Sequence, residues 1–386
     1  MSEQKFIPLS VPNVKGNALA YVTKAIREEW VSTSGGEIVE FEREFAAFLG
    51  VREACAVQSG TAALHLCMRH FGVGPGDLVL VPTLTFIATV NPVVYQGAEP
   101  VFFDCDEHLG IDVDQIERYL VEDCDFDGET VRDRRTGRRV KAIVPVHVFG
   151  EYADMVRLMA VAERFRLIVI EDATESLGTR MPDGRYTGTL AHAAAFSFNG
   201  NKIITTGGGG MVVSNDATAL GHMRYLSQQA KDDAVYFVNN EVGYNYRMTN
   251  LQAALGRAQL EQLPEFLKIK RRNFRKYVEL LAGSPYRLLP FRDPERSNCW
   301  FYSLLTGVRD ASVRDRLIAF LNSHAIQSRP IWTLNHRQRP FAGFRALPTP
   351  RAEFFYDQVV NLPCSTNLEE ADIVRVCATV AEFGRQ

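Results

Sequence analysis

The segment AIVPVHVFGEYADMVRLMAVAERFRLIVIEDA, residues 142–173, decides the fold class of this chain. It contains two short apolar runs, 142–146 and 167–170, separated by an amphipathic stretch at 155–164. Runs of this length predict buried strands, and the stretch between them predicts a helix. A strand, a helix and a second strand in this order predict a parallel βαβ unit.

The same alternation extends on both sides of this unit. Expected strands lie at 54–57, 78–81, 100–103, 193–198 and 211–214. Expected helices lie at 17–29, 37–49, 61–71, 86–95, 113–120, 217–226, 250–262 and 263–282. The charged insert between 121 and 140 predicts a surface hairpin. The sequence therefore predicts an α/β fold with a mostly parallel central sheet and helices on both faces.

A change of pattern near residue 265 predicts the domain boundary. Beyond residue 285 the chain combines a strand-like segment at 300–305, a helix at 313–322, loops rich in Arg, Pro and aromatic residues, and a closing helix at 369–383. We expect a large domain at 1–265 and a smaller C-terminal α+β domain at 266–386, as the length of 386 residues allows.

Composition narrows the class of protein. A hydrophobic content of 46% predicts a large core, and a net charge of −3 gives no reason to expect a nucleic-acid or membrane partner. The N-terminal sequence lacks the apolar centre of a signal peptide. The sequence contains no run of about 18 apolar residues, the length needed to span a membrane, so we expect no transmembrane helix. Because the seven cysteines show no C-x-x-C spacing, we expect reduced thiols in a cytoplasmic protein and no metal site.

Two charged residues carry the main chemical hypothesis. Asp172 follows the predicted strand at 167–170, where α/β folds bind ligands, although it could instead cap the next helix. Lys202 follows the predicted strand at 193–198. A desolvated lysine has a lowered pKa and can attack an aldehyde, whereas a solvated lysine at a strand end is the more common situation.

Two further features favour a planar, anionic ligand. The run Ser59-Gly60-Thr61 opens a predicted helix, and the free N–H groups of a first helical turn attract a phosphate. Phe86, at the end of another predicted strand, can stack on a ring or belong to the core. The glycines at 207–210 precede a strand, so they do not fit the helix-opening turn of an NAD site.

In this order, six strings resemble the DegT/StrS family of sugar-nucleotide aminotransferases: SGTAAL (59–64), PTLTFIAT (82–89), PVHVFG (145–150), EDATESLG (171–178), SFNGNK (197–202) and GYNYRMTNLQAALG (243–256). The resemblance extends over almost the whole chain. It implies a fold-type I transferase, similar to aspartate aminotransferase, with pyridoxal 5′-phosphate (PLP) as its cofactor.

The resemblance also implies the roles of individual residues. Lys202 would bind the cofactor covalently and move a proton, and Asp172 would pair with the protonated pyridine nitrogen. Glu175 would lie near the phenolic oxygen, where the family often has Gln or His. The other implied contacts are to the phosphate and the ring face: Gly60, Thr61, Ala62, Ser197, Phe86 and, from a neighbouring subunit, Asn245. A shared site of this kind implies a homodimer or a larger assembly.

The narrower likeness concerns the substrate. Four segments are similar to aminotransferases of bacillosamine and legionaminic acid pathways: SFNGNK (197–202), ITTGGGGM (204–211), QAKDD (229–233) and the end of the charged insert, RTGRRVKA (135–142). That likeness implies UDP-4-keto-6-deoxy-N-acetylglucosamine as acceptor, and we take L-glutamate as the amino donor as a hypothesis. The alternative acceptor is the GDP-4-keto-6-deoxymannose of perosamine synthases. We expect the nucleotide to contact Trp30, Ser32, Thr33, Arg329, Trp332 and His336.

Two other functions remain alternatives. A sugar dehydratase of the same fold typically has histidine in place of the lysine, and Lys202 argues against it. A catalytically silent binding protein on this scaffold would have no need of Lys202 and Asp172 together.

Overall fold

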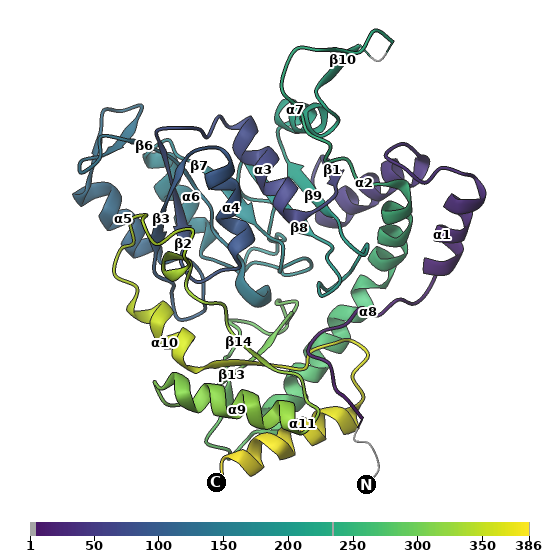
Figure 1. Cartoon of the computed structure of the whole chain (residues 1–386), viewed down its shortest axis with the longest axis vertical. Coiled ribbons are helices and arrows are strands. Elements are labelled where there is room, and N and C mark those ends of the chain that lie inside the picture. The colour runs from purple at the N-terminus through teal and green to yellow at the C-terminus, as the bar shows by residue number, and fades with distance from the viewer. Residues whose placement is uncertain (1–4, 234, 386) are drawn as a thin grey trace.

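The computed structural model describes residues 5–233 and 235–385, and its main element is a nine-stranded sheet (Figure 1). Neighbouring strands from β8 to β3 run parallel, whereas β9 pairs antiparallel with both β1 and β8. The prediction of a mostly parallel sheet is confirmed. Seven of its strands follow the order β1 (Glu53–Val57), β9 (Gly210–Ser214), β8 (Ala193–Ser197), β7 (Ile168–Asp172), β6 (Arg139–Ile143), β2 (Asp77–Pro82) and β3 (Glu99–Phe103). The other two are β5 (Val131–Asp133), which also pairs with β6, and β4 (Cys124–Phe126), which pairs with β5.

Helices cover both faces of this sheet because successive side chains of a strand point to opposite sides. In β2, Val79 and Val81 pack in one apolar cluster with α3 (Gly60–His70), α4 (Asn91–Tyr95) and α7 (Ala217–Ser227). Leu78 and Leu80 pack in a second cluster with α5 (Val113–Glu122) and α6 (Met155–Arg164). Towards β1, this second face is covered by α2 (Gly36–Leu49) and the first half of α8 (Asn250–Leu280).

The connections contain the expected hairpin and three short 3-10 helices. The hairpin of β4 (Cys124–Phe126) and β5 (Val131–Asp133) confirms the surface insert predicted at 121–140. The predicted helix at 86–95 is split, because Phe86 is extended and a 3-10 turn precedes α4. The 3-10 helices are η1 (Ile87–Thr89), η2 (Val148–Gly150) and η3 (Asn335–Arg337).

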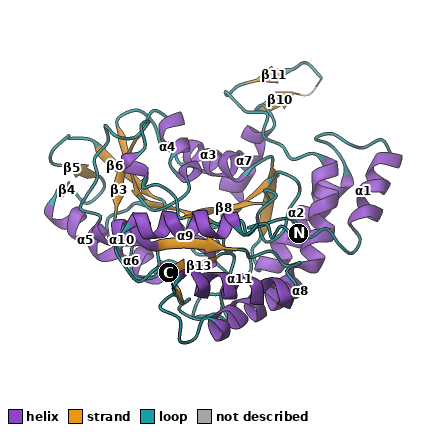
Figure 2. Cartoon of the chain, turned by 60° about the horizontal axis from the view of Figure 1, so that its bottom comes forward, coloured by secondary structure: helices purple, strands orange, loops and turns teal. Residues whose placement is uncertain are grey.

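A second, smaller sheet lies beside the first and is antiparallel (Figure 2). Its order is β12 (Arg287–Leu288), β13 (Tyr302–Leu305), β15 (Val359–Leu362) and β14 (Arg329–Pro330). Apolar residues of this sheet form one core with α9 (Ala311–Ser323), α10 (Pro350–Gln358), α11 (Glu370–Phe383) and the second half of α8. Sequence patterns gave no indication of α10 and β15, which lie in the region expected to form loops.

Helix α8 joins the two bodies. Its 31 residues include Pro264, so the two helices predicted at 250–262 and 263–282 are one helix. The proposed boundary at 265/266 falls inside α8. Two segments pack against the body on the other side of this boundary. Ile7 and Leu9 belong to the core of the smaller body, and Phe341 belongs to an apolar cluster of the large sheet.

All seven cysteines are buried and free. Over the described residues, no helix has both the length and the apolar character needed to cross a membrane.

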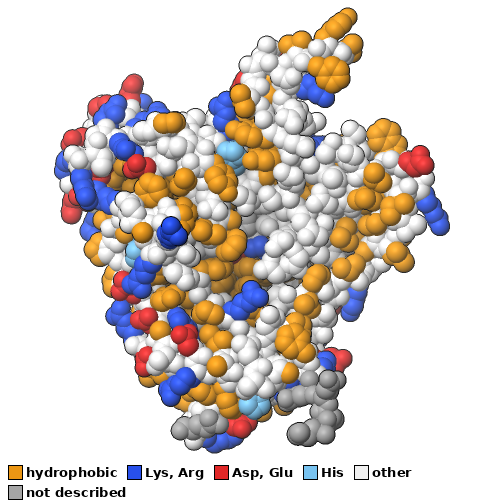
Figure 3. Space-filling model, viewed as in Figure 1, with side chains coloured by type: hydrophobic (Ala, Val, Ile, Leu, Met, Phe, Trp, Pro, Cys, Tyr) orange, Lys and Arg blue, Asp and Glu red, His pale blue; other side chains and the backbone are white. Residues whose placement is uncertain are grey.

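A short hairpin projects from the large body (Figure 1). It consists of β10 (Lys231–Asp233) and β11 (Val238–Asn239), which pair antiparallel. Its tip exposes apolar side chains, among them Tyr236 and Phe237. Hydrophobic side chains are visible on this projection at the top of the space-filling view (Figure 3). The sequence did not predict this hairpin.

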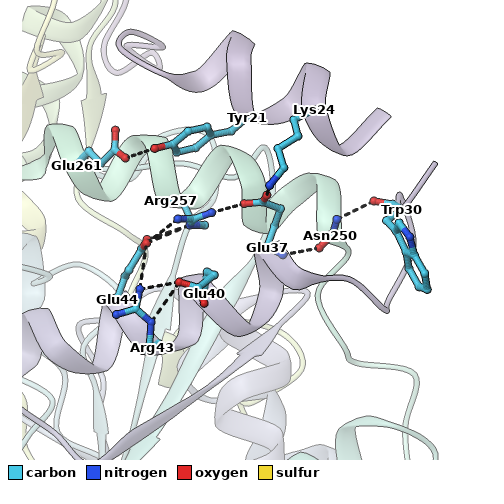
Figure 4. Close-up of polar contacts among 10 residues, drawn as sticks. All are labelled: Tyr21, Lys24, Trp30, Glu37, Glu40, Arg43, Glu44, Asn250, Arg257 and Glu261. Atoms are coloured by element: carbon cyan, nitrogen blue, oxygen red, sulfur yellow. Dashed lines mark hydrogen bonds and ion pairs between the residues drawn. The ribbon is translucent and has the colours of Figure 1, made fainter. Parts of the chain in front are cut away.

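Ion pairs join α1 (Ala18–Arg27) to α2 and α2 to α8 (Figure 4). Arg257 of α8 donates to two carboxylates of α2, Glu37 and Glu44. Glu37 is buried and also pairs with Lys24 of α1, with 3.0 Å between Nζ and Oε1. Because one buried carboxylate is shared by cations from two helices, removal of either cation leaves charge with poor compensation.

Replacing Arg257 by methionine is expected to lower the free energy of unfolding by about 3 kcal/mol, because Glu37 then stays buried with one exposed cation. The matched control is Arg43→Met, which breaks an exposed pair with Glu40 and is expected to cost less than about 1 kcal/mol. Urea unfolding of both variants measures the difference. Equal losses in the two variants would contradict this account of the network.

Candidate active site

A cavity of about 620 Å³ lies between the large sheet and the smaller body. Strand β7 ends at Asp172 and β8 ends at Ser197, so the carboxyl ends of two adjacent parallel strands open into it. Another wall comes from the β14–β15 side of the smaller body and consists of Gln327, Arg329, Pro330, Trp332 and Asn361. Of the expected site residues, those that line the cavity are Gly60, Thr61, Phe86, Asp172, Glu175, Ser197, Lys202, Arg329 and Trp332.

The amine of Lys202 lies inside this cavity. Its Nζ atom is 3.7 Å from Oε1 of Glu175 and 4.0 Å from the centre of the Trp300 ring. Burial lowers the pKa of the Lys202 ammonium, and the carboxylates of Glu175 and Asp172 oppose that shift. A buried amine of lowered pKa is suited to nucleophilic attack on an aldehyde.

The Asp172 carboxylate is held by two donors. Thr89 donates its hydroxyl to Oδ2 at 2.6 Å, and the Thr174 N–H donates to Oδ1 at 3.1 Å. Thr89 also shares a hydrogen bond with Thr85 at 3.0 Å. Because the carboxylate is buried yet faces the cavity, it can hold the proton of a heterocyclic nitrogen in place.

Glu175 is the second buried carboxyl group in the cavity. It accepts the Phe149 N–H at 2.9 Å on Oε2. Burial raises the pKa of Glu175 to about 7, although the Lys202 ammonium and the Phe149 N–H act in the opposite direction. Phe149 has a φ of 56°, a left-handed conformation that is strained for an aromatic residue. The backbone thus adopts an unfavourable conformation at the point where it binds this carboxyl group.

The start of α3 offers an anion site. Ser59 caps the helix by accepting the Ala62 N–H at 3.0 Å, and Ala62 does not line the cavity, so the expected phosphate contact of Ala62 stays a prediction. Gly60 and Thr61 do line it. A Cβ atom on Gly60 would lie 3.0 Å from the side chains of Ser197 and Thr174, so the close approach at this position favours glycine.

Five other expected residues lie away from the cavity of their own chain. His336 does not line it, because its Nδ1 is hydrogen-bonded at 2.7 Å to Oγ1 of Thr83 beside β2. Asn245 pairs with Gln228 next to α7. Trp30, Ser32 and Thr33 lie in the α1–α2 connection, which Asn250 anchors by hydrogen bonds to the backbone oxygens of Trp30 and Ser32. A single chain therefore does not bring this connection to Arg329 and Trp332.

Several residues that line the cavity were not predicted from the sequence. Thr89 lies inside the string PTLTFIAT, but its bond to Asp172 joins η1 to the end of β7, two elements that are far apart in sequence. Trp300 lies at the start of a predicted strand, where an aromatic residue suggests only core packing. Gln327 comes from a region with no recognisable motif, whereas Asn361 opens the string NLPC (361–364), the last one that resembles the family. Only the strings around Thr89 and Asn361 could have indicated these contacts.

Comparison with known proteins agrees with this geometry. Residues 12–381 match the model of the DegT/DnrJ/EryC1/StrS aminotransferase family. The chain is 39% identical to GDP-perosamine synthase of Caulobacter vibrioides over 98% of this chain and 99% of that protein. It is 35% identical to GDP-perosamine synthase of Escherichia coli O157:H7, with the same coverage.

A solved structure agrees as well. A DegT DnrJ EryC1 StrS aminotransferase from Brucella abortus superposes with a TM-score of 0.86 at 30% identity, over 96% of both chains. The match of the family model along almost the whole chain and the identity to full-length relatives point to the same family. The chain therefore belongs to the DegT/DnrJ/EryC1/StrS aminotransferase family and is a PLP-dependent sugar-nucleotide aminotransferase.

Proposed function

We propose that this enzyme transfers the amino group of L-glutamate to C4 of GDP-4-keto-6-deoxymannose. The observation that carries the proposal is the 39% identity to a GDP-perosamine synthase over nearly the full length of both proteins. This revises the preference for a UDP-linked acceptor, which depended on short strings only. That identity extends over 98% of this chain, whereas the strings that favoured the UDP-linked acceptor are a few short segments.

The residues of the cavity fit PLP. Its aldehyde requires a buried amine, its ring nitrogen an acid, and its phosphate an anion site. Lys202, Asp172 and the start of α3 meet these needs within one cavity. When bound, PLP supplies the electron sink and carries the amino group between donor and acceptor.

The protein's own groups then handle protons and charge. Lys202 Nζ takes the α proton of glutamate and later delivers a proton to C4 of the sugar. The Asp172 carboxylate keeps the ring nitrogen protonated, and Thr89 and Thr174 hold that carboxylate in position. Glu175 exchanges a proton with Lys202, whose Nζ is 3.7 Å away.

The nucleotide part of the substrate is proposed to lie against the smaller body. Arg329 is exposed and lines the cavity, and a guanidinium forms paired hydrogen bonds with a diphosphate. Trp332 and Phe86, with ring centres 6.4 Å apart, offer flat apolar surfaces beside it.

We further propose a homodimer that works in the cytoplasm. Asn245, Trp30, Ser32 and Thr33 lie away from the cavity of their own chain, as expected of residues that complete the cavity of a partner. The exposed apolar tip of the β10–β11 hairpin also supports an interface with a second subunit, because exposed apolar patches are typical of such interfaces.

The substrate proposal is tested by incubating the PLP-loaded enzyme with glutamate and a panel of 4-keto-6-deoxy sugars linked to GDP or UDP. We expect 2-oxoglutarate to form with GDP-4-keto-6-deoxymannose, at a kcat/KM at least about tenfold above that of the UDP-linked acceptor. The opposite ranking would restore the UDP-linked substrate. No 2-oxoglutarate from any of these sugars would refute both assignments.

Replacing Glu175 by glutamine is expected to change the pH dependence of kcat. Below about pH 7 the wild-type carboxyl is protonated and cannot accept a proton from Lys202, and above it the carboxylate can, so kcat should rise through pH 7. Glutamine does not titrate, so the variant should lose this limb and about tenfold in maximal kcat. The matched control is Glu151→Gln, because burial also raises the pKa of Glu151 to about 7 but this carboxyl lies outside the cavity. If kcat of the Glu175→Gln variant still rose through pH 7, the titrating group would be a residue other than Glu175.

A further inference from the structure

The loop that carries Lys202 is held by hydrogen bonds from the smaller body. The backbone oxygen of Asn201 accepts two of them, from the Trp300 indole N–H at 2.8 Å and from the Ser10 hydroxyl at 3.1 Å. Asn201 precedes Lys202 directly. Both donors therefore act one peptide bond away from the residue whose amine enters the cavity.

Trp300 contacts Lys202 in a second way. The indole ring lies 4.0 Å from Lys202 Nζ, while its N–H binds the carbonyl of the preceding residue. One side chain thus fixes the backbone of this loop and also packs against the amine. Any shift of Trp300 would displace the loop and the amine together.

Trp300 is itself anchored by a buried lysine of α8. Lys270, only 3% exposed, donates its ammonium to the backbone oxygen of Trp300 at 2.6 Å and to that of Cys364. Burial lowers the pKa of Lys270. The amine stays in a desolvated position because two carbonyls compensate for the lost water.

The hydrogen bonds close into a ring. The Cys364 N–H donates to the backbone oxygen of Leu9 at 2.8 Å, and Leu9 precedes Ser10, which donates to Asn201. Five segments that are distant in sequence meet in this ring: 9–10, 201–202, 270, 300 and 364. The Lys270 amine bridges two of the other segments, because it donates to the backbone oxygens of both Trp300 and Cys364.

We propose that Lys270 is a positioning residue that acts through Trp300 to hold the Lys202 loop in its reactive geometry. This inference rests on the proposed role of Lys202 as the cofactor lysine. Lys270 does not line the cavity. Its amine donates to two backbone oxygens and lies 4.8 Å from the centre of the Tyr302 ring. Its contribution is geometric, since a misplacement of a reacting group by about 1 Å can cost about 10²-fold in rate.

The test compares Lys270→Met with Lys268→Met, a control on the same helix whose side chain is 75% exposed. Backbone hydrogen exchange of residues 197–206 is measured in the full chain, before and after PLP is added. In Lys270→Met we expect exchange in this segment to rise about tenfold, while kcat falls about 10–100-fold and KM for the sugar nucleotide changes less than about twofold. The control should match the wild type.

Two results would overturn the proposal. One is a folded Lys270→Met protein with unchanged exchange at 197–206, and the other is a rise in KM with unchanged kcat. If Lys270→Met does not fold, the double variant Ser10→Ala, Trp300→Phe removes both donors to Asn201 while keeping an aromatic ring. It must then show the same faster exchange. Because exchange without PLP is independent of the role of Lys202, it separates this proposal from the cofactor assignment.

Discussion

The Lys202→Ala variant is expected to lose essentially all transaminase activity, with kcat lowered by at least about 10⁴-fold. The substitution removes the amine that would bind the cofactor and also the group that would move the proton, and the second loss alone is worth about 10²–10⁴-fold. Release of 2-oxoglutarate from glutamate and the preferred 4-keto sugar measures the change.

The control for this variant is Lys268→Ala, which removes an exposed lysine of α8 and should leave kcat unchanged. The Lys202→Ala variant should also bind PLP without the visible absorption of the lysine-linked form. Turnover within tenfold of the wild type would exclude Lys202 as the catalytic amine.

The Asp172→Asn variant is expected to lower kcat by about 10²–10³-fold while PLP stays bound. Asparagine keeps the shape and can still accept from Thr89, but its uncharged amide cannot stabilise a protonated ring nitrogen. Steady-state kinetics at saturating PLP, together with the visible spectrum, measure the effect.

A matched control for Asp172→Asn is Asp154→Asn. Asp154 caps α6 by accepting the Arg157 N–H, and asparagine caps a helix about as well. Its kcat should equal that of the wild type. If Asp172→Asn were equally active, the carboxylate would be only a structural group at the end of β7.

The residues at strand ends could be predicted because their chemistry and their position agree. Asp172 and Lys202 each follow an apolar run, and parallel strands bring their carboxyl ends to one edge. The contacts that hold them could not be predicted in the same way. Thr89, Trp300 and Lys270 act across distances of many residues, and no local pattern encodes which backbone oxygen a buried amine will reach.

Local rules also misjudged α8 and the smaller body. A proline usually ends a helix, yet Pro264 lies inside α8 because contacts with α2 on one side and with α11 on the other hold the helix together. The short strands β12 and β14 have only two residues each, so they carry no periodic pattern. Their pairing depends on neighbours that are distant in sequence.

The most direct measurement of the central claim is peptide mass spectrometry after borohydride reduction of the PLP-loaded enzyme. Reduction fixes the cofactor to whichever amine holds it. The account predicts a pyridoxyl-phosphate adduct on the peptide that contains Lys202, with bleaching of the visible absorption. An adduct on another lysine, or none in a protein saturated with PLP, would contradict it.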